Sequence, residues 1–160
     1  MFQTHRIFCA TPWELEAERY RFYDVVGLFN ETVAMQKGIL FVPVTLTNVM
    51  DKRPLQYMID QNICDCRHYL LLLSEGWGPE ARNFRNDYHL AVQCVDDHAL
   101  PMHSVAVLAK KQPSGQRPVE GLPEPQATFS TPAEFDACVT DLLSGWLESL
   151  AGGLASGQAG

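Results

Sequence analysis

The stretch that decides the fold is YLLLLS at residues 69–74, which is apolar over five consecutive positions. A strand exposed on one face alternates apolar and polar residues, because neighbouring side chains point to opposite faces. This run is apolar on both faces. It therefore predicts the central strand of a parallel sheet, with helices covering both sides.

Three other segments are typical of parallel strands. Residues 6–10 (RIFCA) form a short apolar run that ends at a Thr-Pro pair, and residues 104–109 (SVAVLA) are apolar and partly β-branched. Residues 39–45 (ILFVPVT) contain Pro43, which has no N–H to donate to a neighbouring strand. We therefore expect about four strands, with residues 39–45 at an edge.

Helical patterns follow each expected strand. Residues 11–14 (TPWE) and 131–134 (TPAE) both match a capping box, with Thr as the N-cap and Glu three residues later. These boxes predict helices that run to about Phe29 and through Leu150. Apolar residues at helical spacing predict two more helices, over residues 54–64 and from about residue 80 to Cys94.

The remaining segments lack periodicity. Residues 111–130 are rich in Pro, Gly and Gln, and predict a long connection. Residues 151–160 are rich in Gly, Ala and Ser, and predict a flexible tail after a single domain over residues 1–150.

The alternation of strands and helices predicts a three-layer α/β domain with a parallel sheet and helices on both faces. We expect the strand order 2-1-3-4. Ligands of such sheets bind outside the carboxyl ends of the strands, where the strand order reverses. That point lies between the first and third strands, beside Thr11 and Trp13 on one side and Glu75, Gly76 and Trp77 on the other.

Composition limits the classes of partner. The formal net charge is −7, the pI is about 5.1, and no stripe of Lys and Arg is present, which argues against nucleic-acid binding. No apolar run approaches the roughly 20 residues that cross a bilayer, and the first residues do not resemble a signal peptide. We therefore expect a cytoplasmic protein with no membrane or nucleic-acid partner.

Cysteine usage points to free thiols. Five cysteines are an odd number, in a chain long enough to fold without disulfides. The segment CDCRH at residues 64–68 resembles a metal-ligand cluster, because residues i, i+2 and i+4 of an extended chain share a face. No second ligand pair accompanies it, so we expect reduced, metal-free cysteines.

Several common catalytic motifs are missing from the sequence. It contains no Gly-x-Gly-x-x-Gly, Walker A loop, Gly-x-Ser-x-Gly or His-Glu-x-x-His. The sequence therefore does not support assignment as a Rossmann oxidoreductase, P-loop kinase, α/β-hydrolase or zincin, and it implies no cofactor.

Residues 7–19 (IFCATPWELEAER) resemble the opening of the bacterial DUF4062 domain family, which runs strand, Ser-Ser-Thr, then acid-Leu-x-x-Glu-Arg. The matching positions are Thr11, Glu14, Leu15, Glu18 and Arg19, while Cys9 and Ala10 replace the two serines. Residues 87–91 (DYHLA) resemble the acid-x-x-x-Ala element that this family shares with nucleoside deoxyribosyltransferases and TIR domains. The resemblance covers residues 6–110.

The resemblance implies a TIR-like or flavodoxin-like fold, some relatives of which cleave N-glycosidic bonds in nucleosides or NAD. In the catalytic relatives the helical acid is Glu, whereas the matching residue here is Asp87, one methylene shorter. Asp87 is the candidate catalytic carboxylate or ribose acceptor, and Glu75 its candidate partner. The alternatives are a solvated helix-surface acid for Asp87 and a loop charge for Glu75.

The other candidate residues would hold the ligand. Thr11 offers a hydroxyl at a helix start that suits an anion, or else it caps the helix alone. Trp13 and Trp77 would stack on a base, or would cover the rim of the core. Gly76 lies between the third strand and Trp77.

Two functions remain open from the sequence. The first is nucleotide, nucleoside or NAD binding with a possible N-glycosidase site. The second is a non-catalytic protein-interaction or signalling module. For nucleotide binding, Asp87 can reach the ligand site only if its helix begins late, after Gly78 and Pro79.

Overall fold

The computed structural model describes residues 1–44, 55–74, 76–77, 84–111 and 121–158, and it contains one five-stranded parallel sheet. The strand order is β2-β1-β3-β4-β5, so the predicted order 2-1-3-4 and the internal position of the first strand are confirmed. The strands are β1 (Gln3–Ala10), β2 (Ile39–Val44), β3 (His68–Leu73), β4 (Ser104–Lys110) and β5 (Ala127–Phe129).

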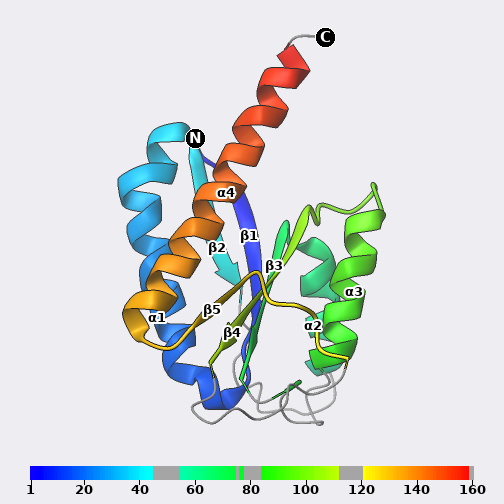
Figure 1. The fold of residues 1–160 in the computed structure, drawn as a ribbon. Helices are drawn as coiled ribbons and strands as arrows, with labels where there is room; N and C mark the ends of the chain where they lie inside the picture. The colour runs from blue at the N-terminus through cyan, green and yellow to red at the C-terminus, as the bar shows by residue number, and fades with distance from the viewer. Residues whose placement is uncertain (45–54, 75, 78–83, 112–120, 159–160) are drawn as a thin grey trace.

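Helices cover both faces of this sheet in a three-layer, flavodoxin-like arrangement. They are α1 (Glu16–Phe29), α2 (Leu55–Asp65), α3 (Phe84–Asp96) and α4 (Pro132–Gln158). In Figure 1, α1 and α4 lie side by side on one face of the sheet, and α2 and α3 lie on the other. The first and last helices of the chain therefore share a layer.

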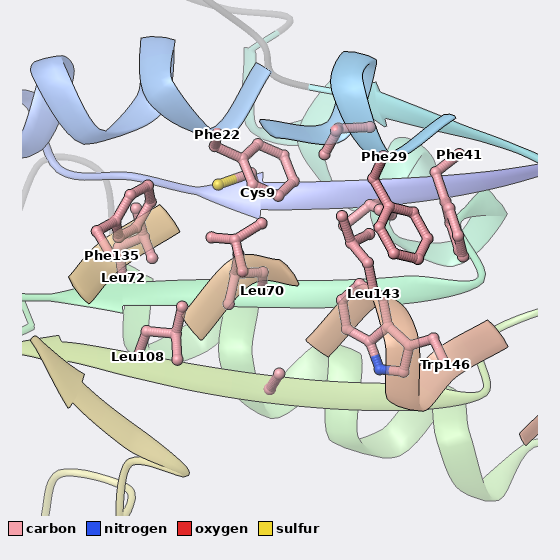
Figure 2. Packing of buried hydrophobic residues seen from close by; sticks show 14 of the residues in the cluster. Cys9, Phe22, Phe29, Phe41, Leu70, Leu72, Leu108, Phe135, Leu143 and Trp146 are labelled. Atoms are coloured by element: carbon pink, nitrogen blue, oxygen red, sulfur yellow. The ribbon is translucent and has the colours of Figure 1, made fainter. Parts of the chain in front are cut away.

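The central strand β3 is buried on both faces, as its apolar run predicts. All six of its side chains are buried. Leu70 and Leu72 point to the α1 and α4 layer, where they meet Phe22, Leu143 and other apolar side chains (Figure 2). Tyr69, Leu71 and Leu73 belong to the second core, under α2 and α3.

The fifth strand corrects the expectation of about four strands. β5 lies within residues 111–130, which the sequence predicts to be a connection without periodicity. Its three residues are too short to show a pattern, yet Phe129 is buried and its carbonyl accepts a hydrogen bond from the N–H of Lys111 at 2.8 Å. Residues 112–120 of the same connection lie outside the described residues.

The two capping boxes have different outcomes. At the second, the N–H of Glu134 donates to Thr131 Oγ1 at 3.2 Å, and Glu134 Oε2 accepts from the N–H of Ser130 at 2.8 Å. At the first, Pro12 precedes a 3₁₀ turn and no side chain caps it, so the predicted capping role of Thr11 is wrong. The Thr11 hydroxyl instead lies 3.2 Å from Cys9 Sγ.

The first helical segment continues past its predicted end at Phe29. A π-helical turn over Asn30–Ala34 and a 3₁₀ turn over Met35–Lys37 follow, and Gly38 ends the segment with a φ of 75°. This left-handed conformation favours glycine. Asn30 accounts for the extension, because its side chain is buried against β2 and holds the extra turn on the sheet.

Asn30 forms hydrogen bonds to backbone groups on the outer edge of β2. Its Nδ2 donates to the carbonyl of Phe41 at 2.9 Å, and its Oδ1 accepts from the N–H of Phe41 at 2.9 Å. Alternate residues of a strand direct their backbone groups to the same side, so Pro43 also faces this edge, where its missing N–H leaves no neighbour unpaired. The predicted edge position of this strand is confirmed.

The last helix also runs further than predicted. Our prediction ends it at Leu150, whereas α4 continues through Gln158. Residues 151–158 contain two alanines and one leucine beside three glycines, so helix propensity alone does not account for the extension. None of the described helices has the length and apolar content that a membrane span requires.

Candidate functional site

The candidate site lies where the chain changes direction across the sheet. From β1 the chain passes to β2 at one edge and then returns to β3 on the other side of β1. The strand order therefore reverses between β1 and β3, and ligands of open parallel sheets bind beyond the carboxyl ends of such a strand pair. The residues that follow Ala10 and Leu73 lie at this position, where the strand order predicts a ligand crevice.

Asp87 lies at the crevice end of the sheet, in the first turn of α3. The described part of α3 begins at Phe84, and the expected start near residue 80 lies outside the described residues. Its side chain has 0% exposure, so the alternative of a solvated surface acid is wrong. The amino end of a helix stabilises a carboxylate through the helix dipole.

Gln56 is the residue of this site that the sequence does not reveal. It lies in the first turn of α2, and its Nε2 donates to Asp87 Oδ1 at 3.0 Å and to Asp60 Oδ1 at 2.8 Å. Gln56 and Asp87 are 31 residues apart in sequence and meet because α2 and α3 pack on the same face. No local sequence signal pairs them.

Trp77 contacts the two residues of α3 that follow Asp87. Its ring centroid is 5.8 Å from that of Tyr88 and 6.3 Å from that of His89. The side chain of Trp77 is half-buried against the second core, which agrees with the rim-covering alternative and leaves part of the ring exposed. Gly76, directly before it, has a φ of 141°, a conformation that side-chain-bearing residues rarely adopt.

Trp13 and Thr11 occupy the opposite side of the crevice. Trp13 is 76% exposed, so it does not cover the rim of the core. Thr11 is half-buried and directs its hydroxyl to Cys9. Glu75, the candidate partner of Asp87, lies outside the described residues.

The acid and base matched by the resemblance have structural contacts on α1. Glu18 Oε1 accepts a hydrogen bond from Lys110 Nζ at 2.9 Å, which ties α1 to the end of β4. Arg19 pairs with Glu16 at 3.1 Å, and its guanidinium lies 5.2 Å from the ring centroid of Tyr20. These contacts hold the helix that follows the crevice.

The cysteine cluster does not form the arrangement that a metal site would need. Cys64 and Asp65 belong to the last turn of α2, so residues 64–68 are not an extended segment. Among the described residues, no three Cys, His, Asp or Glu side chains come together as a metal-binding group. Cys64 Sγ instead lies 3.5 Å from Cys94 Sγ on α3, and all five cysteines are free thiols.

We expect three of these thiols to resist alkylation in the native protein. Burial raises the pKa of Cys9, Cys66 and Cys94 to about 12 from 9.0, which lowers their thiolate fraction at pH 8 by about 1000-fold. Iodoacetamide labelling followed by mass spectrometry should modify all five cysteines in denaturant. In the native protein these three should remain unmodified after the denatured sample has reacted completely.

The same digest, run without reductant, tests the expectation of reduced cysteines. A peptide linking Cys64 to Cys94 would show that the thiol contact between α2 and α3 is oxidised in the native protein. Rapid native labelling of Cys9, which is 3% exposed, would contradict its burial.

No protein-family model and no curated protein matches this sequence. The resemblance carried by residues 7–19 and 87–91 accordingly remains an expectation.

Proposed function

We propose that the crevice beyond β1 and β3 binds a nucleotide or nucleoside, NAD included, in a TIR-like manner. The observation that carries this proposal is the position of Asp87, a buried acid at the amino end of α3 and at the reversal of strand order. Its carboxylate would accept hydrogen bonds from ribose hydroxyls. Trp77 and the exposed ring of Trp13 would offer stacking surfaces for a base.

The reaction that fits this arrangement is hydrolysis of an N-glycosidic bond. Asp87 would stabilise or attack the anomeric carbon as the base departs with the bonding electrons. Water would then add its hydroxyl to the anomeric carbon and release a proton, which gives the free sugar. Because the Asp87 side chain has no exposed surface, the ligand must displace Gln56 or another neighbour to reach it. New hydrogen bonds from ribose hydroxyls to Asp87 would offset the loss of its hydrogen bond from Gln56.

Ligand binding is tested first by thermal shift with NAD, nucleosides and nucleotides. A ligand present at 100 times its Kd stabilises the native state by about 2.7 kcal/mol, which raises the melting temperature measurably. Stabilisation by one class and not by its free base or ribose alone supports the crevice proposal. No shift with any of them would contradict it.

Asp87→Asn should then reduce release of the free base by at least about 100-fold, because the amide lacks the carboxylate charge. The fold should persist, since Asn keeps an oxygen that can accept from Gln56. Asp87→Glu, which restores the acid of the catalytic relatives, should hold or raise the rate. Chromatography of the released base measures all three proteins.

Asp96→Asn provides the matched control, because it makes the same change at the opposite end of α3, where the side chain is exposed. It should retain the wild-type rate. Full cleavage by Asp87→Asn would overturn the glycosidase proposal.

A protein-interaction module is the second candidate function, and one observation favours it. Asp87 is completely covered and bonded to Gln56, as a structural acid would be, while Trp13 presents a large apolar ring to solvent. A partner that docks on this ring would lose affinity with Trp13→Ala and not with Asp87→Asn. The nucleotide proposal expects the Asp87 substitution to matter as well.

A further inference from the structure

A cavity lies at the end of the sheet opposite the proposed crevice. Its volume is about 410 Å³, and it is bounded by the start of β3, the segment between α3 and β4, and the last turn of α3. Its polar lining comes from Arg67, Asp97, His98 and His103. Its apolar lining includes Leu100 and Met102.

The backbone of Arg67 is fixed on both sides. Its N–H donates to the carbonyl of Arg6 at 2.9 Å, and its carbonyl accepts from the N–H of His103 at 2.7 Å. Arg67 therefore has a fixed backbone position between α2 and β3, and it lines the cavity there.

The guanidinium of Arg67 has no anionic partner among the residues that the structure describes. Its Nε is buried and makes no hydrogen bond to any of them, and no described carboxylate lies within ion-pair distance. Burial lowers the pKa of Arg67, which reflects the removal of water from its charge. A partly desolvated charge without a partner is unfavourable.

Two histidines share the cavity with this charge, although the whole chain carries a net charge of −7. His98 and His103 line the same cavity. Among the described lining residues the acid is Asp97, which accepts a hydrogen bond from the N–H of Ala99 at 3.0 Å and is exposed. Apart from Asp97, the described polar side chains of the lining can all donate hydrogen bonds.

We propose that this cavity binds the carboxylate or phosphate group of a small ligand, held by the side-chain fork of Arg67 beside His98 and His103. Planar guanidinium groups bind such oxyanions through two parallel hydrogen bonds. Leu100 and Met102 would contact an apolar portion attached to the anion. The site is independent of the proposed nucleotide crevice, which lies beyond the other ends of the strands.

A purely structural role for Arg67 makes the opposite prediction. The carboxyl end of α3 borders the cavity, and a cation there can stabilise the negative end of the helix dipole. In that case removal of the guanidinium destabilises the protein in every buffer. In our proposal, the guanidinium charge destabilises the folded protein until an anion binds beside it.

The test compares wild type with Arg67→Met by thermal unfolding in buffer with chloride as the only anion. We expect Arg67→Met to melt at the same temperature as wild type or above it. Inorganic phosphate, added at constant ionic strength, should raise the melting temperature of wild type only. Arg85→Gln, which removes an exposed cation at the other end of α3, should respond as wild type does.

Direct binding is measured by the NMR shift of the Arg67 Nε–H resonance with phosphate, acetate and hexanoate. Tighter binding of hexanoate than of acetate identifies a carboxylate with an apolar tail, whereas preference for phosphate identifies a phosphorylated ligand. Arg67→Lys, which keeps the charge and loses the fork, should weaken binding at least tenfold. A lower melting temperature of Arg67→Met in chloride, or no saturable shift with any of the three anions, would overturn the proposal.

Discussion

The free energy of unfolding is expected to fall by about 4 kcal/mol between pH 7 and pH 5, because two buried histidines must stay neutral in the native state. Burial lowers the pKa of His5 to about 4 and that of His68 to about 3, from 6.5. The charge of Arg67 lowers both further. Each histidine thus contributes about 2 kcal/mol to the loss at pH 5.

The contacts of the two rings explain why neither accepts a proton. His68 stacks on Trp146, with centroids 4.2 Å apart, and its Nδ1 lies 2.6 Å from Ser104 Oγ. Its Nε2 and both ring nitrogens of His5 are buried without a hydrogen-bond partner among the described residues. A proton added to either ring would place an uncompensated charge in the core.

The sign of the effect follows from the lowered pKa values. Below pH 6.5 the unfolded histidines bind protons that the folded ones do not, so stability is complete above that pH and decreases as the pH falls toward 4 and 3. Denaturant titrations at pH 7 and pH 5 measure it. The double variant His5→Phe with His68→Phe should lose less than about 1 kcal/mol over the same interval. Equal losses in the two proteins would contradict the assignment.

Asn30→Ala should destabilise the protein by about 2–4 kcal/mol, because it leaves the N–H and the carbonyl of Phe41 without partners. Both groups are buried, and each is bonded to the Asn30 amide at 2.9 Å. The substitution also frees the outer edge of β2 for pairing with another chain. Urea denaturation gives the stability, and light scattering gives the aggregation that an open edge promotes.

Asn30→Asp separates the two bonds of this amide. The carboxylate still accepts from the Phe41 N–H but faces the Phe41 carbonyl with a second acceptor, so it should also destabilise the protein. Gln36→Ala, an exposed change in the same helical segment, should alter stability by less than about 0.5 kcal/mol. A neutral Asn30→Ala would show that water replaces the amide.

The sequence predicts the sheet well because its strands are strongly patterned. The apolar run of β3 and the proline of β2 place one strand at the centre and the other at the edge, and the second capping box marks the start of α4. β5 is not predicted, because three residues are too few to show the alternating pattern of a strand. The first capping box misleads because Thr11 binds Cys9 rather than the helix.

The candidate site is predictable only in its location. The alternation of elements predicts a parallel sheet, and the expected order 2-1-3-4 places the reversal between the first and third strands, beside Trp77. The burial of Asp87 depends on Gln56 from another helix, and the exposure of Trp13 depends on how the 3₁₀ turn leaves β1. Such contacts between distant segments have no signature in local spacing. The same reason hides the two buried histidines and Arg67, whose guanidinium has no anionic partner in the described part of the chain.

The pairing of α1 with α4 bears on how the chain folds during synthesis. Val139, Leu143 and Leu147 of α4 fill the layer beside α1, over the face of β3 that carries Leu70 and Leu72. A nascent chain that has released β3 and β4 must keep the part of this face under α4 uncovered until α4 leaves the ribosome. Such late closure exposes apolar surface to chaperones and to neighbouring nascent chains. Substitutions in α4 should therefore reduce the yield of soluble protein in cells more than their effect on the finished fold implies.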